Sequence, residues 1–171
     1  MDAITTMTEH DIAFAFEGLL QRHRGIVFKV AHTYCHDIED RAELAQEIAT
    51  QLWRAFPSFN SERSASTWMY RVALNVAISH VRHQVARRGR TVSIDEDLHD
   101  VAGDDAANPE SQQQVHQLQR FIARQAPLDR ALLLLYLDDR PQREIAEVLG
   151  LTETNVSTKI ARLKQRIRSE L

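Results

Sequence analysis

Hydrophobic side chains recur every three or four residues along most of the chain, which is the spacing of one buried helix face. The first such stretch covers residues 11–35 and begins with Ile12 and Phe16. This spacing predicts helix over that whole segment. Gly18 and Gly25 fall inside it and weaken the prediction of an unbroken helix, because glycine is a poor helix former.

A charged segment around Asp37 and Asp40 then interrupts the pattern, and either residue can cap the next helix. That helix places one apolar residue in each turn: Leu44, Ile48, Leu52 and Phe56. A polar loop over residues 57–64 follows it. Ser66 or Thr67 is the predicted N-cap of a further amphipathic helix.

The periodicity is lost over residues 91–110 and returns in residues 111–171. Asn108 followed by Pro109 is typical of an N-cap and a first helical position. The run Leu132–Leu137 is apolar nearly all round, which predicts a central buried helix.

The C-terminal part of the chain predicts a helix-turn-helix. Pro141 starts a short helix, Gly150 is a natural residue after its end, and Thr152 is a good N-cap for the last helix. The last helix buries a regular set of apolar residues: Val156, Ile160, Leu163 and Ile167. Its polar face suits the major groove of DNA, although a plain helical hairpin with a solvated face has the same pattern.

Composition supports helices, because the 171 residues include only 5 Gly and 4 Pro. The fold class we predict is therefore all-α, with two small helical domains over residues 1–90 and 111–171. A flexible acidic linker, residues 91–110, is expected to join them.

Charge is segregated along the chain, although the formal net charge is only -3. Residues 71–90 contain five arginines and no acid, residues 91–119 contain seven acids and no Lys or Arg, and residues 140–171 carry a net charge of +3. Locally basic segments of this kind indicate contact with nucleic acid more clearly than the average does.

A row of basic and polar residues lies next to aromatic residues in the helix predicted after the polar loop. Arg71, Asn75, Ser79 and Arg82 recur at helical spacing, just after the aromatic residue Trp68. Base-stacking surfaces beside cations are typical of single-stranded nucleic-acid binding. The alternative is that Trp68, with its neighbours Met69 and Tyr70, is simply part of the core, and that Asn75 is an ordinary surface residue.

Two parts of the chain resemble a known protein family. The segments Leu44–Ile48, Leu52–Arg54 and Trp68–Ala77 resemble promoter-melting region 2 of the extracytoplasmic-function (ECF, group IV) sigma factors of bacterial RNA polymerase. Residues 127–171 are similar to region 4 of the same family, with Ile145, Ala146, Leu149 and Gly150 at its scaffold positions. The resemblance implies a sigma factor that directs promoter-specific transcription initiation, and not an enzyme.

The resemblance also implies roles for individual residues. One helix face would dock on the clamp helices of the polymerase large subunit: Asp40, Glu43, Gln46, Glu47, Thr50 and Arg54. The family usually has two adjacent acids where this chain has Ala42 and Glu43, so one acid is missing. The melted strand of the -10 element would contact Phe59, Asn60, Ser61, Arg63, Trp68, Arg71, Asn75, Ser79 and Arg82. The -35 element would contact Arg143, Asn155, Ser157, Thr158, Lys159, Arg162 and Lys164.

The implied partners are core RNA polymerase, through its clamp helices and flap, promoter DNA, and an anti-sigma factor or another restraining regulator. No cofactor is expected. His32, Cys35 and His36 would share a helix face if the helix extends that far, but without a fourth ligand in sight we predict no metal site. The single cysteine, the lack of a signal-peptide pattern and the lack of a long apolar run predict a cytoplasmic protein with no membrane insertion.

Two other functions fit parts of the sequence. A stand-alone dimeric helix-turn-helix regulator with a helical sensing domain would bind palindromic duplex DNA by itself. An anti-sigma-like or scaffold protein would bind polymerase without contacting DNA, but it leaves the basic segment and the polar last helix unexplained.

Overall fold

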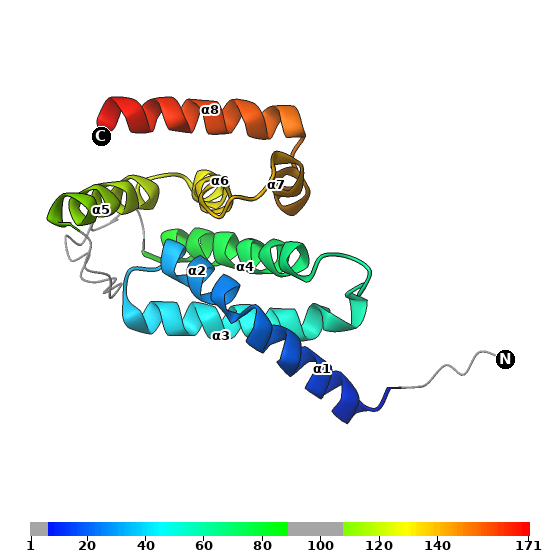
Figure 1. Cartoon of the computed structure of the whole chain (residues 1–171). Coiled ribbons are helices and arrows are strands. Elements are labelled where there is room, and N and C mark those ends of the chain that lie inside the picture. Colours follow the sequence, from blue (N-terminus) through cyan, green and yellow to red (C-terminus); the bar gives the residue numbers. More distant parts are fainter. Residues whose placement is uncertain (1–6, 89–107) are drawn as a thin grey trace.

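The computed structural model describes residues 7–88 and 108–171, and all regular elements in these two ranges are helices (Figure 1). The predicted all-α fold is therefore confirmed. The predicted flexible linker, residues 91–110, lies outside the described residues except for its last three. We call residues 7–88 the N-terminal module and residues 108–171 the C-terminal module.

The N-terminal module consists of α1 (Glu9–Arg22), α2 (Arg24–Tyr34), α3 (Ile38–Ala55), the short 3-10 helix η1 (Phe56–Ser58) and α4 (Ala65–Arg88). The C-terminal module consists of α5 (Pro109–Ala123), α6 (Pro127–Leu137), α7 (Gln142–Leu149) and α8 (Glu153–Glu170). In Figure 1 the helices form successive layers, with α3 at one side, α2 and α4 next to it, then α5, α6 and α7, and α8 at the far side. The first helix, α1, projects from the stack.

The segment predicted as a single helix, residues 11–35, is in fact two helices that meet at His23. Both Gly18 and Gly25 lie inside helices, so neither is the break. Burial gives the reason: α1 buries only Leu19, whereas α2 buries a full face, namely Ile26, Val27, Val30, Ala31 and Tyr34. The chain turns at His23, so that α2 enters the core while α1 projects away from it (Figure 1).

The start of α4 also differs from the prediction. Neither Ser66 nor Thr67 is the cap, because the helix already begins at Ala65. Instead the Ser64 hydroxyl accepts a hydrogen bond from the backbone N–H of Thr67 at 3.4 Å. The predicted polar loop is shortened further by η1 at its start. Sequence pattern located the helix but not its first turn, where several Ser and Thr residues compete for the cap.

The helix-turn-helix is present where it was predicted. Gly150 has a φ of 68° and ends α7 with its N–H donated to the Ala146 carbonyl. The Thr152 hydroxyl then caps α8 by accepting the Asn155 N–H at 3.1 Å. The central helix α6 is less enclosed than expected, because Leu137 at its end is 51% exposed.

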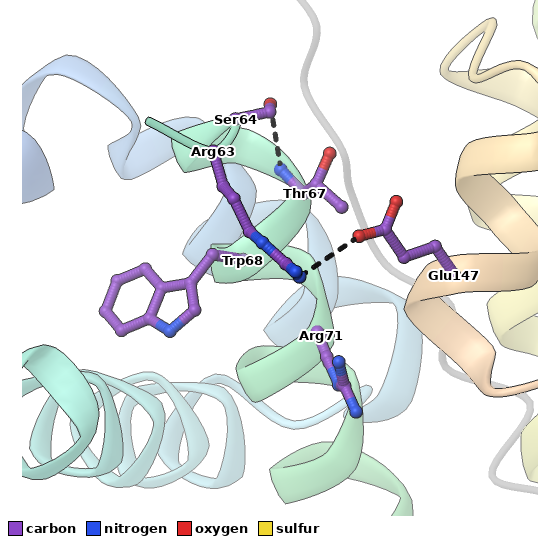
Figure 2. Close-up of a pocket in the computed structure, with 6 residues that line it drawn as sticks. All are labelled: Arg63, Ser64, Thr67, Trp68, Arg71 and Glu147. Carbon is purple, nitrogen blue, oxygen red and sulfur yellow. Dashed lines mark hydrogen bonds and ion pairs between the residues drawn. The ribbon is translucent and has the colours of Figure 1, made fainter. Parts of the chain in front are cut away.

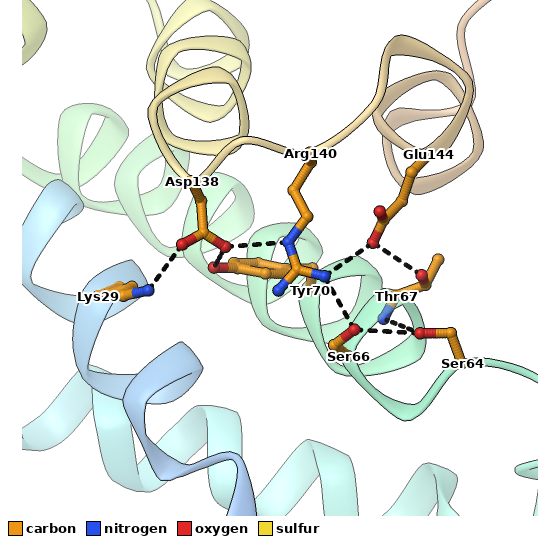
Figure 3. A network of polar contacts seen from close by, with 8 residues as sticks. All are labelled: Lys29, Ser64, Ser66, Thr67, Tyr70, Asp138, Arg140 and Glu144. Carbon is orange, nitrogen blue, oxygen red and sulfur yellow. Dashed lines mark hydrogen bonds and ion pairs between the residues drawn. The ribbon is translucent and has the colours of Figure 1, made fainter.

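A polar network joins the end of α6 to α2 and α4, and so joins the two modules (Figure 3). The Asp138 carboxylate accepts hydrogen bonds from Lys29 Nζ at 2.7 Å, from the Tyr70 hydroxyl at 2.7 Å and from Arg140 Nε at 2.9 Å. Burial alone would raise the pKa of Asp138, but these three hydrogen bonds outweigh it and lower the pKa to about 2. The carboxylate is therefore ionised at any cellular pH.

Arg140 extends this network along α4. Its Nη1 atom donates to the Ser66 hydroxyl at 2.9 Å and to Oε1 of Glu144 at 3.1 Å, while its guanidinium lies 5.1 Å from the centroid of the Tyr70 ring. The same Glu144 oxygen accepts the Thr67 hydroxyl at 2.9 Å. The first turn of α7 is thereby fixed against the first turn of α4 (Figure 3).

Two glycines provide a test of the helix-turn-helix geometry. We expect Gly150→Ala to lower the free energy of unfolding by about 1 kcal/mol, because a side chain is disfavoured in the left-handed conformation. Gly18→Ala should raise it by about 0.5–1 kcal/mol, because Gly18 lies within α1 and an added Cβ would have no atom within 4 Å.

Urea unfolding followed by circular dichroism measures both variants. Since the two substitutions are chemically identical, opposite signs isolate the effect of backbone conformation. An unchanged or higher midpoint for Gly150→Ala would contradict the left-handed turn between α7 and α8.

Candidate nucleic-acid interface

The predicted polymerase-binding residues all lie on α3. Glu43, Gln46, Glu47, Thr50 and Arg54 are exposed and follow one side of the helix, whereas Asp40 is half-buried. Glu47 is the most constrained, since its Oε2 atom lies 3.4 Å from Nδ1 of His80 on α4. The opposite face of α3 is held in the core by Leu44, Ile48 and Leu52. The face is therefore rigid, polar and accessible.

The aromatic residues near the predicted -10 site form a cluster at the junction of η1 and α4. The Phe59 ring lies 4.8 Å from the Trp68 ring and stacks on the Phe56 ring at 6.1 Å. Phe16 of α1 completes the cluster, 5.3 Å from Phe56. Phe59 and Trp68 are both half-buried, so each belongs to the core on one side and to the surface on the other.

A pocket of about 230 Å³ opens beside this cluster (Figure 2). Its lining comes from the loop and α4 of the N-terminal module, with one acid from α7: Arg63, Ser64, Thr67, Trp68, Arg71 and Glu147. Trp68 is the aromatic residue of the lining, its indole pointing away from Glu147 (Figure 2), and two arginines provide positive charge. A flat apolar surface next to cations suits a base and its phosphate.

The remaining residues of the predicted -10 set are spread around this pocket. Arg71, Asn75, Ser79 and Arg82 are exposed along one side of α4, as the sequence predicted. Asn60 and Ser61 are exposed in the loop, where the Asn60 side chain accepts the backbone N–H of Glu62 at 3.0 Å. The side-chain carbonyl of Asn60 therefore stabilises the loop, and the side-chain amide nitrogen remains able to donate a hydrogen bond to a base.

The predicted -35 residues are divided between two sides of the recognition helix, α8. An α-helix turns by about 100° per residue, so Asn155, Thr158, Lys159 and Arg162 share one side. Ser157 and Lys164 lie on the other side of the buried stripe, and Lys164 Nζ lies 4.6 Å from the ring centroid of Tyr136 on α6. Arg143 is exposed in the first turn of α7, at the end of that helix away from Gly150. The predicted -35 residues therefore do not form a single row, but lie on both sides of the buried stripe of α8 and on α7.

Comparison with protein families identifies both halves of this arrangement. Residues 19–87 match the model of Sigma-70 region 2, and residues 116–167 match the model of Sigma-70 region 4. The chain belongs to the sigma-70 family. Its two modules are therefore called region 2 and region 4 below.

Similar proteins of known function indicate which group within the family this chain resembles. The ECF RNA polymerase sigma factor SigW of Bacillus subtilis is 23% identical over 168 residues, covering 92% of this chain and 89% of that protein. The RNA polymerase sigma-H factor of Pseudomonas aeruginosa is 27% identical over 165 residues, covering 90% of this chain and 84% of that protein. These similarities support an ECF sigma factor, and they do not favour the stand-alone regulator that the sequence left open.

A solved structure shares the fold. The structure of CnrH in complex with the cytosolic domain of CnrY superposes with a TM-score of 0.65 at 18% identity, covering 92% of this chain and 87% of that chain. At this level of identity the likeness concerns the fold alone. It extends over both regions and so over the whole helical architecture.

Sequence pattern missed the residues that connect region 2 to region 4. Lys29, Tyr70, Asp138, Arg140 and Glu144 were not expected to form a site, yet they make the network of Figure 3. The only local signal is a cluster of charges directly after an apolar helix. Their partners lie far away in the sequence, so spacing could not reveal them.

The side chains of His32, Cys35 and His36 were considered as metal ligands. Among the described residues, no group of three or more His, Cys, Asp or Glu side chains is arranged to hold a metal ion. Cys35 is 4% exposed, and its burial raises the pKa of the thiol to about 11. The helices of the described part also include none long and apolar enough to cross a membrane.

We expect the Cys35 thiol of the native protein to react very slowly with Ellman's reagent at neutral pH, because a buried thiol with a raised pKa supplies almost no thiolate. Unfolding in guanidinium should release one equivalent of thiol per chain, since Cys35 is the only cysteine. Absorbance of the released thionitrobenzoate measures both states. Fast and complete reaction of the native protein would show that the junction of α2 and α3 opens readily.

Proposed function

We propose that this chain is a group IV sigma factor in which region 2 binds core RNA polymerase and the melted -10 strand while region 4 contacts the -35 element in the major groove. The observation that carries the proposal is the composite surface of region 2, where the pocket beside Trp68 continues into the row of Arg71, Asn75 and Arg82. This surface combines stacking, hydrogen bonding and positive charge along one continuous line.

In the proposed role, α3 docks on the clamp helices of the polymerase large subunit. Its exposed side mixes acids with Gln46, Thr50 and Arg54, and a mixed polar face of this kind sets orientation and partner choice more than raw affinity. The hydrogen bond from the Thr50 hydroxyl to the Gln46 carbonyl, at 2.9 Å, keeps that side chain against the helix. Glu43 is then an exposed acid on this side of α3, one turn after the exposed Glu39.

The melted -10 strand is proposed to follow α4 from the pocket toward Arg82. Unstacking a base costs a few kcal/mol, and stacking on an aromatic side chain returns about 1–3 kcal/mol per base. Trp68 is suited to this task because the aromatic cluster fixes its ring on one side. Phe59 packs against the Trp68 ring, so we expect Phe59 to position that ring as well as to contact the strand.

Region 4 is proposed to place α8 in the major groove of the -35 element. The Thr158 hydroxyl donates to the Thr154 carbonyl at 3.0 Å, and the exposed side chain carries a methyl group that suits contact with a base edge. Arg162, one turn further on the same side, is long enough to reach a guanine or a phosphate. Asn155 and Lys159 flank them as phosphate contacts.

The proposed partners are core polymerase with its clamp and flap, promoter DNA, and an anti-sigma factor or other restraining protein. The last is supported by the solved complex of the structural neighbour with the cytosolic domain of a second protein. The chain is proposed to act in the cytoplasm. It is proposed to catalyse no reaction itself, since its part in the holoenzyme is to recognise the promoter.

Core docking can be tested at the position of the missing acid. We expect Glu43→Lys to weaken binding to core polymerase and Ala42→Glu to strengthen it up to about fivefold, which is the usual effect of one exposed charge pair. Competition with a labelled sigma factor for core polymerase measures both. Glu17→Lys, on exposed α1, is the matched charge-reversal control and should leave competition unchanged. Equal loss in Glu43→Lys and Glu17→Lys would reject docking through α3.

The recognition helix can be tested with two arginines of α8. Arg162→Ala should weaken holoenzyme binding to a promoter carrying the -35 element by about 1–3 kcal/mol, while Arg168→Ala should leave it unchanged. Abortive initiation on promoters selected by the holoenzyme, with the -35 element intact or scrambled, is the measurement. Scrambling should remove the difference between Arg162→Ala and the unaltered protein. A deficit of equal size on both templates would mean that Arg162 has no part in -35 recognition.

A further inference from the structure

A histidine of α4 is enclosed against the proposed docking helix, α3. The two helices pack along each other (Figure 1), and the side chain of His80 is only 10% exposed. His80 follows Ser79 of the exposed row directly in the chain, so the neighbouring position on α4 faces inward. A polar ring at this depth needs hydrogen-bonding partners, because an unpaired buried polar group is costly. The partners of the two ring nitrogens therefore define what His80 can do.

Gln84, one turn further along α4, determines which nitrogen of the His80 ring carries the proton. The side-chain nitrogen of Gln84 lies 3.0 Å from Nε2 of His80. An amide nitrogen can only donate a hydrogen bond, so Nε2 accepts it, and the neutral imidazole then has its proton on Nδ1. The hydrogen bond made by one ring nitrogen thus sets the role of the other. His80 is a donor on its Nδ1 side.

The Nδ1 side of the ring faces Glu47 of α3. The distance from Nδ1 to Oε2 of Glu47 is 3.4 Å, which is long for a hydrogen bond but short enough for electrostatic attraction between an N–H group and a carboxylate. The side chain of Glu47 is still 48% exposed. This contact uses one carboxylate oxygen, so the other can accept a hydrogen bond from a partner. His80 therefore restricts Glu47 without withdrawing it from the surface.

Restricting an exposed glutamate favours its use in an interface. A long side chain that is free in solution loses rotamer freedom when a partner holds it, and this loss subtracts from the affinity. A side chain that is already held near its bound conformation loses less. The arrangement of Gln84, His80 and Glu47 supplies such a restraint from inside the helix pair.

We propose that His80 is a positioning residue for core-polymerase docking. With Gln84 fixing its ring, it holds the Glu47 carboxylate ready for the clamp helices and does not touch them itself. The inference rests on the docking role proposed above for α3, and it adds residues of α4 to that site. A histidine that only fills the space between the helices would be equally buried. The two roles differ in whether the effect of His80 on docking passes through Glu47.

Two amide substitutions separate the two ends of the ring. Asparagine has its side-chain nitrogen at the δ position, like Nδ1 of histidine, whereas glutamine has it at the ε position, like Nε2. His80→Asn therefore keeps a donor toward Glu47. His80→Gln keeps a polar group toward Gln84 and loses the donor toward Glu47. Both variants place an uncharged amide between the same helices, so they form a matched pair.

Competition with a labelled sigma factor for core polymerase, in the absence of DNA, measures docking of the full chain. We expect His80→Gln to weaken competition about two- to fivefold, the usual size for one exposed charged contact, and His80→Asn to retain it. Glu47→Gln should weaken it by a similar factor. The double variant of Glu47→Gln and His80→Gln should compete no worse than Glu47→Gln alone, because both changes remove the same contact.

A control and a second variant complete the set. His83→Gln is the same substitution at an exposed position of α4 and should leave competition unchanged. Gln84→Met removes the donor that fixes the ring and should weaken competition in the same direction as His80→Gln by a smaller factor. Thermal unfolding by circular dichroism verifies that each variant is folded. If His80→Gln does not fold, Gln84→Met alone and in the Glu47→Gln background provides the test.

Three outcomes would overturn the positioning role. Equal loss in His80→Asn and His80→Gln would mean that the ring acts through packing. A further loss from His80→Gln in the Glu47→Gln background would mean that its effect does not pass through Glu47. Tighter competition by His80→Gln would mean that His80 draws Glu47 away from the partner.

The docking proposal and the positioning role can fail separately. If Glu43→Lys competes as well as the unaltered chain, docking through α3 fails and the positioning role falls with it. If Glu43→Lys loses affinity while His80→Gln does not, docking through α3 stands and the positioning role alone is rejected.

Discussion

The arrangement of the two modules depends on one carboxylate. Asp138 is the point at which α2, α4 and the end of α6 meet, and it accepts a hydrogen bond from each of Lys29, Tyr70 and Arg140. Charge-assisted hydrogen bonds of this kind are about twice as strong as neutral ones. Removing the acceptor would leave two cations and a buried phenol facing one another, so the contact is stable only as a complete set.

A second interaction supports the first without involving charge. The Tyr34 hydroxyl donates to the Pro127 carbonyl at 2.7 Å, and burial raises the pKa of that phenol, so it remains a donor. Pro127 begins α6 and Asp138 follows its end, so both ends of the helix are fixed to region 2. The orientation of α7 follows from these two anchors, since only the four residues 138–141 separate it from α6.

The features that sequence predicted well are those that depend on neighbours in the chain. The αL residue Gly150, the cap Thr152 and the start at Asn108 and Pro109 follow from backbone conformation and from hydrogen bonds over two to four residues. The division at His23 was missed because it depends on which helix the core accepts, a property of tertiary packing. The cap at Ser64 was missed because several candidates stand close together.

The candidate site likewise contains features that the sequence could predict and features that it could not. Helical spacing placed the exposed row from Arg71 to Arg82 on α4 correctly, because a row on one helix is a local property. It could not decide whether Trp68 is core or surface, and the structure explains why: the ring is half-buried and serves both purposes. It also gave no hint that Glu147 of α7 would lie against Arg63, since no pattern within one helix specifies its partner in another module.

The contact between the regions has a polar part and an apolar part. An apolar interface would expose hydrophobic surface when it opened, at a cost of about 25 cal/mol for each Å². That cost applies here, since buried apolar residues of both regions belong to one hydrophobic core cluster. By contrast, Lys29 and Arg63 are already more than half exposed, so their ion pairs add little to the stability of the contact. Apolar packing therefore contributes most to the stability of the contact between the regions, and the polar network fixes its geometry.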